Sequence, residues 1–171
     1  ILPRDDGWFD QLLAAYSKRG SKVLVSPTIL FEDDSVRWAG TWINSNANGG
    51  QYLSDRYVGY PCAVLADAEP SEVSAGTLEC CILPRKAFKD SNGFTRGYIG
   101  PGGKTLDLAL TLRLAGTPSY WIPDVEVLGS EQSISTAPAW EELSNRLDRW
   151  AFDRRWSLVV SNLRSHNNAV D

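Results

Sequence analysis

Hydrophobic positions recur along the chain with two periods, one typical of helices and one typical of strands. Trp8, Leu12 and Tyr16 are four residues apart, which places them on one face of a helix over residues 5–20. Residues 104–116 are rich in Leu and Ala and predict a second helix. The rest of the pattern predicts, in chain order, a strand at 22–27, a hairpin at 28–43, a loop at 44–51, a strand at 72–83, a short helix at 84–90, a loop at 92–103, two strands within 119–129 that are separated by Pro123-Asp124, and one or two helices at 137–163.

The order of these elements predicts an α/β fold class, in which helices pack on a mixed sheet. A chain of 171 residues is long enough for one hydrophobic core, and no internal repeat or low-complexity segment marks a second domain. We therefore expect residues 1–171 to form a single domain, with the helix at 104–116 buried on one face under the sheet.

Charge and composition exclude several classes of function. The net charge is −4, the pI is about 5.0 and basic residues form no cluster, so we expect no nucleic-acid partner. Apolar runs are too short for a transmembrane segment, and no secretory signal opens the chain. We expect a soluble cytoplasmic protein, with attachment to the periphery of a membrane as an open alternative.

Few residues are available for thiol or imidazole chemistry. The cysteines are Cys62, Cys80 and Cys81, an odd number with two adjacent members, which favours free thiols in a reducing compartment. His166 is the single histidine and lies in a polar C-terminal stretch, so most His-based catalysis and most zinc sites are excluded. No Gly-x-Ser-x-Gly motif occurs, and a serine or cysteine hydrolase therefore has little support.

Residues 97–105, GYIGPGGKT, end as a phosphate-binding P-loop does. A P-loop has Gly, four further residues and then Gly-Lys-Ser/Thr, so its first glycine should stand where this chain has Tyr98. The preceding stretch is polar and does not predict the buried strand that a P-loop follows. The simpler interpretation is a loop that leads into a helix opened by Lys104 and Thr105, which Thr105 can cap.

A longer segment, residues 74–129, carries a more specific signal, SAGTLECCILPRKAFKDSNGFTRGYIGPGGKTLDLALTLRLAGTPSYWIPDVEVLG. It resembles the second, acceptor-side half of family-2 inverting glycosyltransferases of the GT-A fold. The matching segments, in the family's order and spacing, are Ala75-Gly76, Pro84–Phe88, Asn92–Phe94, Lys104–Gly116 and Trp121–Gly129. Residues 1–16 and 23–43 resemble the family segments that come before it, so the likeness spans nearly the whole chain.

The resemblance implies a GT-A-like mixed sheet flanked by helices, without the N-terminal nucleotide-binding strands, as a portion of a larger domain. It implies transfer of a sugar from a nucleotide-sugar donor to a glycan or lipid-linked acceptor, in a bacterial polysaccharide or cell-surface glycan pathway. It also implies a divalent metal, Mn or Mg. The family's metal-binding Asp-x-Asp pair would precede Ile1, so we identify no metal ligand within this chain.

The likeness also implies where the chemistry takes place. The family's catalytic base falls at Lys104 and Thr105, neither of which can accept a proton from a sugar hydroxyl at neutral pH. Asp107 is the nearest carboxylate and is the predicted catalytic residue, although a solvated or capping carboxylate in a first helical turn is the simpler interpretation. The predicted substrate-binding residues are Gly76, Thr77, Glu79, Lys104 and Thr105.

The missing base leaves a second function open, a catalytically inactive glycosyltransferase-like module that binds a glycan or a protein. Seven tryptophans offer flat apolar rings on which sugars can stack. Trp38 and Trp42 are four apart in a predicted strand and would share one face of it. Packing in the core or the hairpin is the commoner reason for such rings.

Overall fold

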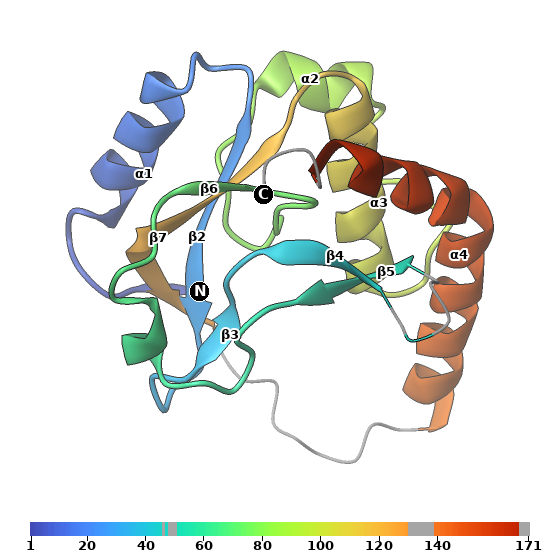
Figure 1. Cartoon of the computed structure of the whole chain (residues 1–171), viewed down its shortest axis with the longest axis horizontal. Helices are drawn as coiled ribbons and strands as arrows, with labels where there is room; N and C mark the ends of the chain where they lie inside the picture. Colours follow the sequence, from blue (N-terminus) through green and yellow to red (C-terminus); the bar gives the residue numbers. More distant parts are fainter. Residues whose placement is uncertain (46, 48–50, 130–138, 168–171) are drawn as a thin grey trace.

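The computed structural model describes residues 1–171 except 46, 48–50, 130–138 and 168–171. Within the described residues, the main sheet has five strands (Figure 1). In pairing order they are β1 (Leu2–Pro3), β7 (Ser119–Leu128), β2 (Leu24–Leu30) and β3 (Val36–Trp38), and β6 (Ser71–Val73) also pairs with β7. Because β2 and β7 are parallel while the other pairs are antiparallel, the sheet is mixed, as predicted.

A bulge lies at the centre of the sheet, where β2 meets β7. All seven residues of β2 are buried. Its pairing skips Pro123, Asp124 and Val125 of β7 between Pro27 and Thr28. A bulge removes ladder hydrogen bonds locally, which is why prolines are tolerated in both strands. The strand break predicted after Pro27 is therefore wrong, and so is the break predicted at Pro123.

The hairpin predicted at 28–43 is divided between two sheets. β3 pairs with β2 as predicted, and the turn between them includes Asp34 with a φ of 63°. Gly40 then redirects the chain with a φ of 95°, a conformation that glycine adopts at little cost. Beyond it, β4 (Thr41–Ser45) pairs with β5 (Gln51–Asp55) in a two-stranded sheet of its own. The sequence pattern does not predict β5.

Helices cover both faces of the main sheet, which confirms the predicted architecture. The helices of the described residues are α1 (Trp8–Lys18), α2 (Arg85–Asp90), α3 (Pro101–Leu114) and α4 (Ala139–Asn167), and a 3-10 turn spans Cys62–Leu65. Leu12 of α1 packs in one cluster with Val25, and Leu108 of α3 packs in another with Leu24. Leu24 and Val25 are neighbours in β2, so their side chains point to opposite faces of the sheet.

Two segments have bounds that differ from the predicted ones. α3 begins at Pro101, three residues before the predicted start, because proline suits the first helical position and lacks only a donor that would be unpaired there. The strand predicted at 72–83 is wrong beyond β6. After β6 the chain makes single bridges, such as the one between Ala75 and Thr41, and then enters α2.

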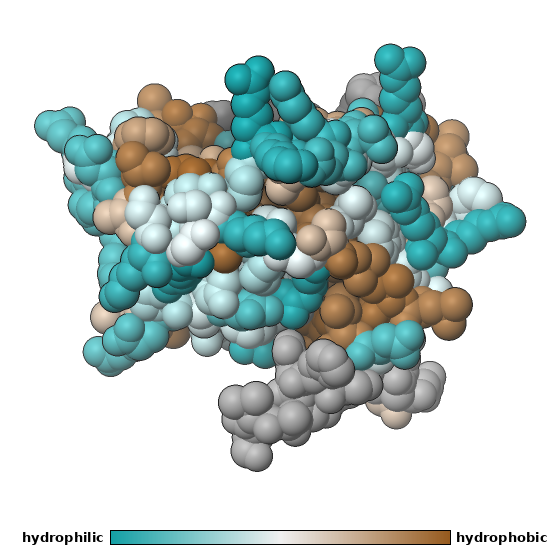
Figure 2. Space-filling view, turned by 90° about the horizontal axis from the view of Figure 1, so that it is seen from above, coloured by the Kyte–Doolittle hydropathy of each residue, from teal (hydrophilic) through white to brown (hydrophobic). Residues whose placement is uncertain are grey.

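α4 is a single helix of 29 residues that lies against α3 and β5 (Figure 1). Its inner face packs Phe152, Trp156 and Val160 with Leu110 of α3. On its outer face, Leu143, Leu147, Trp150 and Leu158 are exposed. Figure 2 shows hydrophobic side chains gathered in patches on the face seen from above, with hydrophilic side chains between them. The first two residues of the predicted helix, 137 and 138, lie outside the described residues, as does part of the loop predicted at 44–51.

No helix in the described part of the chain is both long enough and apolar enough to cross a bilayer. Cys62, Cys80 and Cys81 are free thiols, as predicted. Burial raises the pKa of Cys81 to about 12, and burial together with a hydrogen bond to Glu126 raises that of Cys62 to about 11. These two thiols are therefore protonated and weakly nucleophilic at neutral pH.

Candidate functional site

Four of the six predicted site residues line one cavity, which we call the Asp55 cavity. Gly76, Thr77 and Glu79 come from the segment after β6, and Thr105 comes from α3. The cavity has a volume of about 260 Å³. Its other lining residues are Trp38, Thr41, Leu53, Ser54, Asp55, Pro101, Gly102 and Leu106. The fold thus joins two predicted segments with the β4–β5 sheet.

Asp55 is a carboxylate of this cavity that the sequence pattern does not single out. Its Oδ1 accepts a hydrogen bond of 2.5 Å from Thr41 Oγ1, which itself accepts one of 3.0 Å from Trp38 Nε1. Asp55 is an exposed residue, but partial burial of its carboxyl raises its pKa more than the Thr41 hydrogen bond lowers it. The negative charge of Glu79 raises the pKa further. Asp55 is therefore a stronger base than an ordinary aspartate.

The chain around Gly76 lies tight against the main sheet. A Cβ at Gly76 would stand 2.3 Å from Leu24 Cδ2, so only glycine permits this approach. One residue further, the carbonyl oxygen of Thr77 accepts a hydrogen bond of 2.9 Å from Ser26 Oγ in β2. These contacts with β2 fix the wall of the cavity from which Glu79 extends.

Glu79 has its carboxylate oriented by Arg37. Arg37 Nη2 donates to Oε1 at 3.1 Å and Nη1 lies 3.0 Å from Oε2, so the pair is bidentate. The two side chains are 31% and 45% exposed, which limits what the pair adds to stability. Its effect is geometric, because it holds a second carboxylate at the cavity that contains Asp55.

Lys104 and Thr105 lie one turn inside α3, which corrects the prediction that they open the helix. Thr105 therefore cannot cap α3, whose N-cap is Gly100. Lys104 Nζ donates a hydrogen bond of 3.2 Å to the carbonyl oxygen of Ile99, so its side chain folds back on the preceding loop. Thr105 lines the Asp55 cavity, whereas Lys104 does not.

Asp107 is buried between α3 and α4, with 3% of its surface exposed. Its Oδ1 receives three donors, which are Trp156 Nε1 at 2.8 Å, Tyr98 Oη at 3.1 Å and Arg155 Nε at 3.1 Å. The interpretation of Asp107 as a solvated or capping carboxylate is therefore wrong. Asp107 does not line the Asp55 cavity, and its predicted role as the base stays a prediction.

Trp38 and Trp42 lie in different sheets, because Gly40 breaks the strand that was predicted to hold both. Trp38 is 6% exposed and belongs to the core cluster, although its ring borders the Asp55 cavity. Trp42 is partly buried and packs against the same cluster, with the Arg56 guanidinium 4.2 Å from its ring centroid. Packing thus accounts for most of the surface of both rings.

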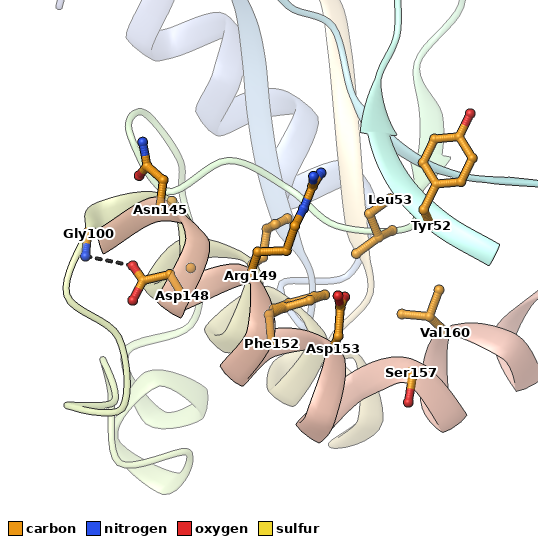
Figure 3. Close-up of a pocket in the computed structure, with 13 residues that line it drawn as sticks. Tyr52, Leu53, Gly100, Asn145, Asp148, Arg149, Phe152, Asp153, Ser157 and Val160 are labelled. Carbon is orange, nitrogen blue, oxygen red and sulfur yellow. Dashed lines mark hydrogen bonds between the residues drawn. The ribbon is translucent and has the colours of Figure 1, made fainter. Parts of the chain in front are cut away.

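A second cavity, which we call the α4 cavity, lies between α4, β5 and the start of α3 (Figure 3). Its volume is about 610 Å³, and it shares Leu53, Gly102 and Leu106 with the Asp55 cavity. Asp148 of α4 closes one end. Its two carboxylate oxygens accept hydrogen bonds of 2.7 Å from the backbone N–H groups of Ile99 and Gly100.

The metal implied by the family resemblance does not fit the described residues. Among them, no group of three or more His, Cys, Asp or Glu side chains could hold a metal ion. Asp55 and Glu79 offer two carboxylates at one cavity, fewer ligands than a divalent metal site usually draws from a protein. We therefore assign no chemical step to a metal held by these residues.

No protein-family model matches the chain, and no curated protein matches it. Among solved structures, it is similar to a crystal structure of GalNAc-T7 with UDP, GalNAc and Mn2+, at 14% sequence identity and a TM-score of 0.49. The similar region covers 72% of this chain and 25% of that chain, so this chain spans about a quarter of its length. We base no assignment on a likeness of this size.

Proposed function

We propose that the chain is a glycosyltransferase-like domain whose Asp55 cavity receives the sugar hydroxyl that is glycosylated. In the proposed reaction, a nucleotide sugar is the donor and a glycan or lipid-linked molecule is the acceptor. One observation carries the proposal: Gly76, Thr77, Glu79 and Thr105, chosen from the sequence resemblance alone, line a single cavity. The two carboxylates in that cavity are candidates for the acid–base chemistry for which the sequence offered only Asp107.

Asp55 is the proposed base. The acceptor hydroxyl oxygen bonds to the anomeric carbon of the donor while its proton passes to the Asp55 carboxylate. The bond between that carbon and the diphosphate breaks, and its electron pair leaves with the diphosphate. A base works best when its pKa approaches the working pH, and burial raises the pKa of Asp55 in that direction. Glu79, held by Arg37, accepts a hydrogen bond from a neighbouring hydroxyl and orients the acceptor.

A second candidate function is a catalytically inactive module that binds a glycan or a protein. It is favoured by Lys104 and Thr105 at the family's base position and by the three donors that already engage Asp107 Oδ1. In this case Asp55 and Glu79 accept hydrogen bonds from sugar hydroxyls without proton transfer. The two functions share a binding site and differ in turnover.

The test combines ligand titration with variants of single carboxylates. Uridine and guanosine diphosphate sugars are titrated calorimetrically with and without Mn²⁺, and release of the nucleoside diphosphate is followed in parallel. For a transferase, Asp55→Asn should lower kcat by about 10²–10⁴-fold with little change in the KM for the nucleotide sugar. Asp124→Asn, an exposed carboxylate on β7, is the control and should leave both unchanged.

Other outcomes separate the alternatives. Full activity of Asp55→Asn together with an inactive but folded Asp107→Asn would return the role of the base to Asp107. Sugar binding without nucleotide release supports the inactive module. Absence of any saturable binding at millimolar nucleotide sugar or free sugar would overturn the transferase and the glycan-binding module, and would leave a protein as the ligand.

A further inference from the structure

Four polar side chains form a row along one face of α4. Asn145, Arg149, Asp153 and Ser157 are spaced four residues apart, which stacks them along the helix surface. All four line the α4 cavity, and Figure 3 shows Arg149 extending toward β5. A span of twelve residues gives this row a length of about 18 Å. We call it the α4 polar row.

The α4 polar row is free to bind a ligand. Within the described part of the chain, Arg149, Asp153 and Ser157 make no hydrogen bond or ion pair with another residue, and all three are exposed. Their groups alternate in character, because a guanidinium donates, a carboxylate accepts and a hydroxyl does both. Nothing in the packing of α4 uses these groups, since the helix is anchored through Asp148, Phe152, Trp156 and Val160 instead.

Beside the α4 polar row lies an apolar surface. It is formed by Leu53, Leu106, Phe152 and Val160, and the ring of Tyr52 stands at its edge. A ligand in this cavity therefore meets hydrogen-bonding groups on one side and apolar carbon on the other. Small-molecule sites commonly combine these two features in volumes of about 300–1,000 Å³, and the α4 cavity falls within that range.

The α4 cavity adjoins the Asp55 cavity. Leu53, Gly102 and Leu106 belong to the walls of both. Gly102 has no side chain at the point where the two meet, and no atom lies within 4 Å of where its Cβ would stand. A ligand with one end beside Asp55 would reach α4 by passing Leu53, Gly102 and Leu106.

We propose that the α4 polar row binds the body of an oligosaccharide whose terminal sugar occupies the Asp55 cavity. This inference rests on the proposed function, and it makes the acceptor a chain of several sugars. Sugar hydroxyls pair with the donors and acceptors of the row, while the C–H faces of the rings lie on Phe152 and Tyr52. A lipid chain would instead desolvate Arg149 and Asp153 without offering either group a hydrogen-bond partner.

The test measures how binding depends on the length of the ligand. Maltose-type, cellobiose-type and chitin-type oligomers of one to six residues are titrated into the native chain, and amide chemical shifts are followed by NMR. Affinity should rise with length in at least one series. One-residue ligands should shift amides near Asp55 and residues 76–79, and longer members should also shift residues 145–157.

Variants distinguish this inference from the function on which it rests. Arg149→Gln combined with Ser157→Ala should weaken the longest ligand by about tenfold or more and leave the one-residue ligand unchanged. Arg146→Gln, which changes an exposed arginine of α4 outside both cavities, is the matched control and should change neither. Asp55→Asn should weaken ligands of every length, which tests the proposed function alone.

Three results would overturn the inference. The first is affinity that does not depend on length, and the second is no binding of any oligomer at millimolar concentration. The third is tighter binding of octyl glucoside than of any oligosaccharide, with amide chemical-shift changes confined to the apolar wall. This result would mean that the α4 cavity binds a lipid chain. If release of the nucleoside diphosphate from a nucleotide sugar still depends on Asp55, the proposed function survives each of these results.

Discussion

The indole Nε1 of Trp156 donates a hydrogen bond of 2.8 Å to Oδ1 of Asp107, and this contact joins α4 to α3. Both residues are buried, with 4% and 3% of their surfaces exposed. The same oxygen also receives the hydroxyl of Tyr98 and the guanidinium of Arg155. Because α4 forms one wall of the α4 cavity, Asp107 is one of the residues that hold this wall in position.

Removing this carboxylate should destabilise the protein. In Asp107→Ala, Trp156 and Tyr98 lose the acceptor of their buried donors, and each such loss costs about 1–3 kcal/mol. Arg155 is 51% exposed and can turn to water, so it adds little. We expect a loss of about 2–5 kcal/mol in the free energy of unfolding, measured by urea denaturation, and a smaller loss for Asp107→Asn, whose amide oxygen still accepts.

Asp153→Ala is the control for this measurement, because Asp153 is an exposed carboxylate of the same helix without a partner among the described residues. It should change the free energy of unfolding by less than about 0.5 kcal/mol. Equal stabilities of Asp107→Ala and Asp153→Ala would contradict the structural role of Asp107. Loss of turnover in a fully stable Asp107→Asn would point to catalysis instead.

Two glycines of the Asp55 cavity should respond in opposite ways to substitution by alanine. A Cβ at Gly76 meets Leu24 Cδ2 at 2.3 Å and Ser119 Cβ at 3.2 Å, so Gly76→Ala should cost about 1–3 kcal/mol through overpacking. A Cβ at Gly102 meets nothing within 4 Å, and alanine favours the helix, so Gly102→Ala should stabilise by about 0.5–1 kcal/mol. Thermal unfolding of the two variants checks the signs, and a stable Gly76→Ala would contradict the close approach.

The sequence predicts most elements whose residues are periodic. The spacing of Trp8, Leu12 and Tyr16 correctly predicts α1, because that helix buries one face against the sheet. β5 has no such signal, since it pairs with a single partner strand and alternation of its side chains is weak. For the same reason, the sequence pattern does not single out Asp55, which lies at the end of β5. Asp55 becomes a candidate only in the folded chain, where it pairs with Thr41 of β4 and accepts a hydrogen bond from its hydroxyl.

The candidate site could be predicted in part from the family resemblance. That resemblance named Gly76, Thr77, Glu79 and Thr105, which the fold gathers at one cavity. The resemblance does not predict which residues surround Asp107. Trp156, which donates a hydrogen bond to Asp107, is 49 residues away in sequence and belongs to another helix. Contacts of this kind arise from how helices pack, and no local pattern encodes them.

The loop before α3 should loosen when Asp148 is removed. Asp148 accepts from the backbone N–H groups of Ile99 and Gly100, and in Asp148→Ala both donors must find water instead. We expect faster hydrogen exchange at these two amides and a loss of about 1–3 kcal/mol in the free energy of unfolding. The Leu110 amide, in the buried part of α3, is the internal reference and should exchange as in the native chain. Unchanged protection at Ile99 would show that the loop is held by other contacts.

The stability contributed by Asp55 should depend on pH with a definite sign. Its pKa in the folded protein is raised above 3.8, mainly by burial, so the fold favours its protonated form. The associated stability is present below pH 3.8 and is lost as the pH rises through the raised pKa. In Asp55→Asn, the residue does not titrate, so this loss of stability does not occur. The amide oxygen of the new asparagine still accepts the hydrogen bond from Thr41. Relative to the native chain, the variant should therefore gain stability as the pH rises from below 3.8 to neutral.

Urea denaturation across this pH range measures the difference in the free energy of unfolding between Asp55→Asn and the native chain. Glu79→Gln provides the companion variant, because it removes the negative charge that helps to raise the pKa of Asp55. In a Glu79→Gln background, the midpoint of the pH-dependent difference should move to lower pH. A difference that stays constant with pH, or that grows as the pH falls, would mean that the Asp55 carboxyl is not held in a desolvated state. The burial on which its role as a base depends would then be absent.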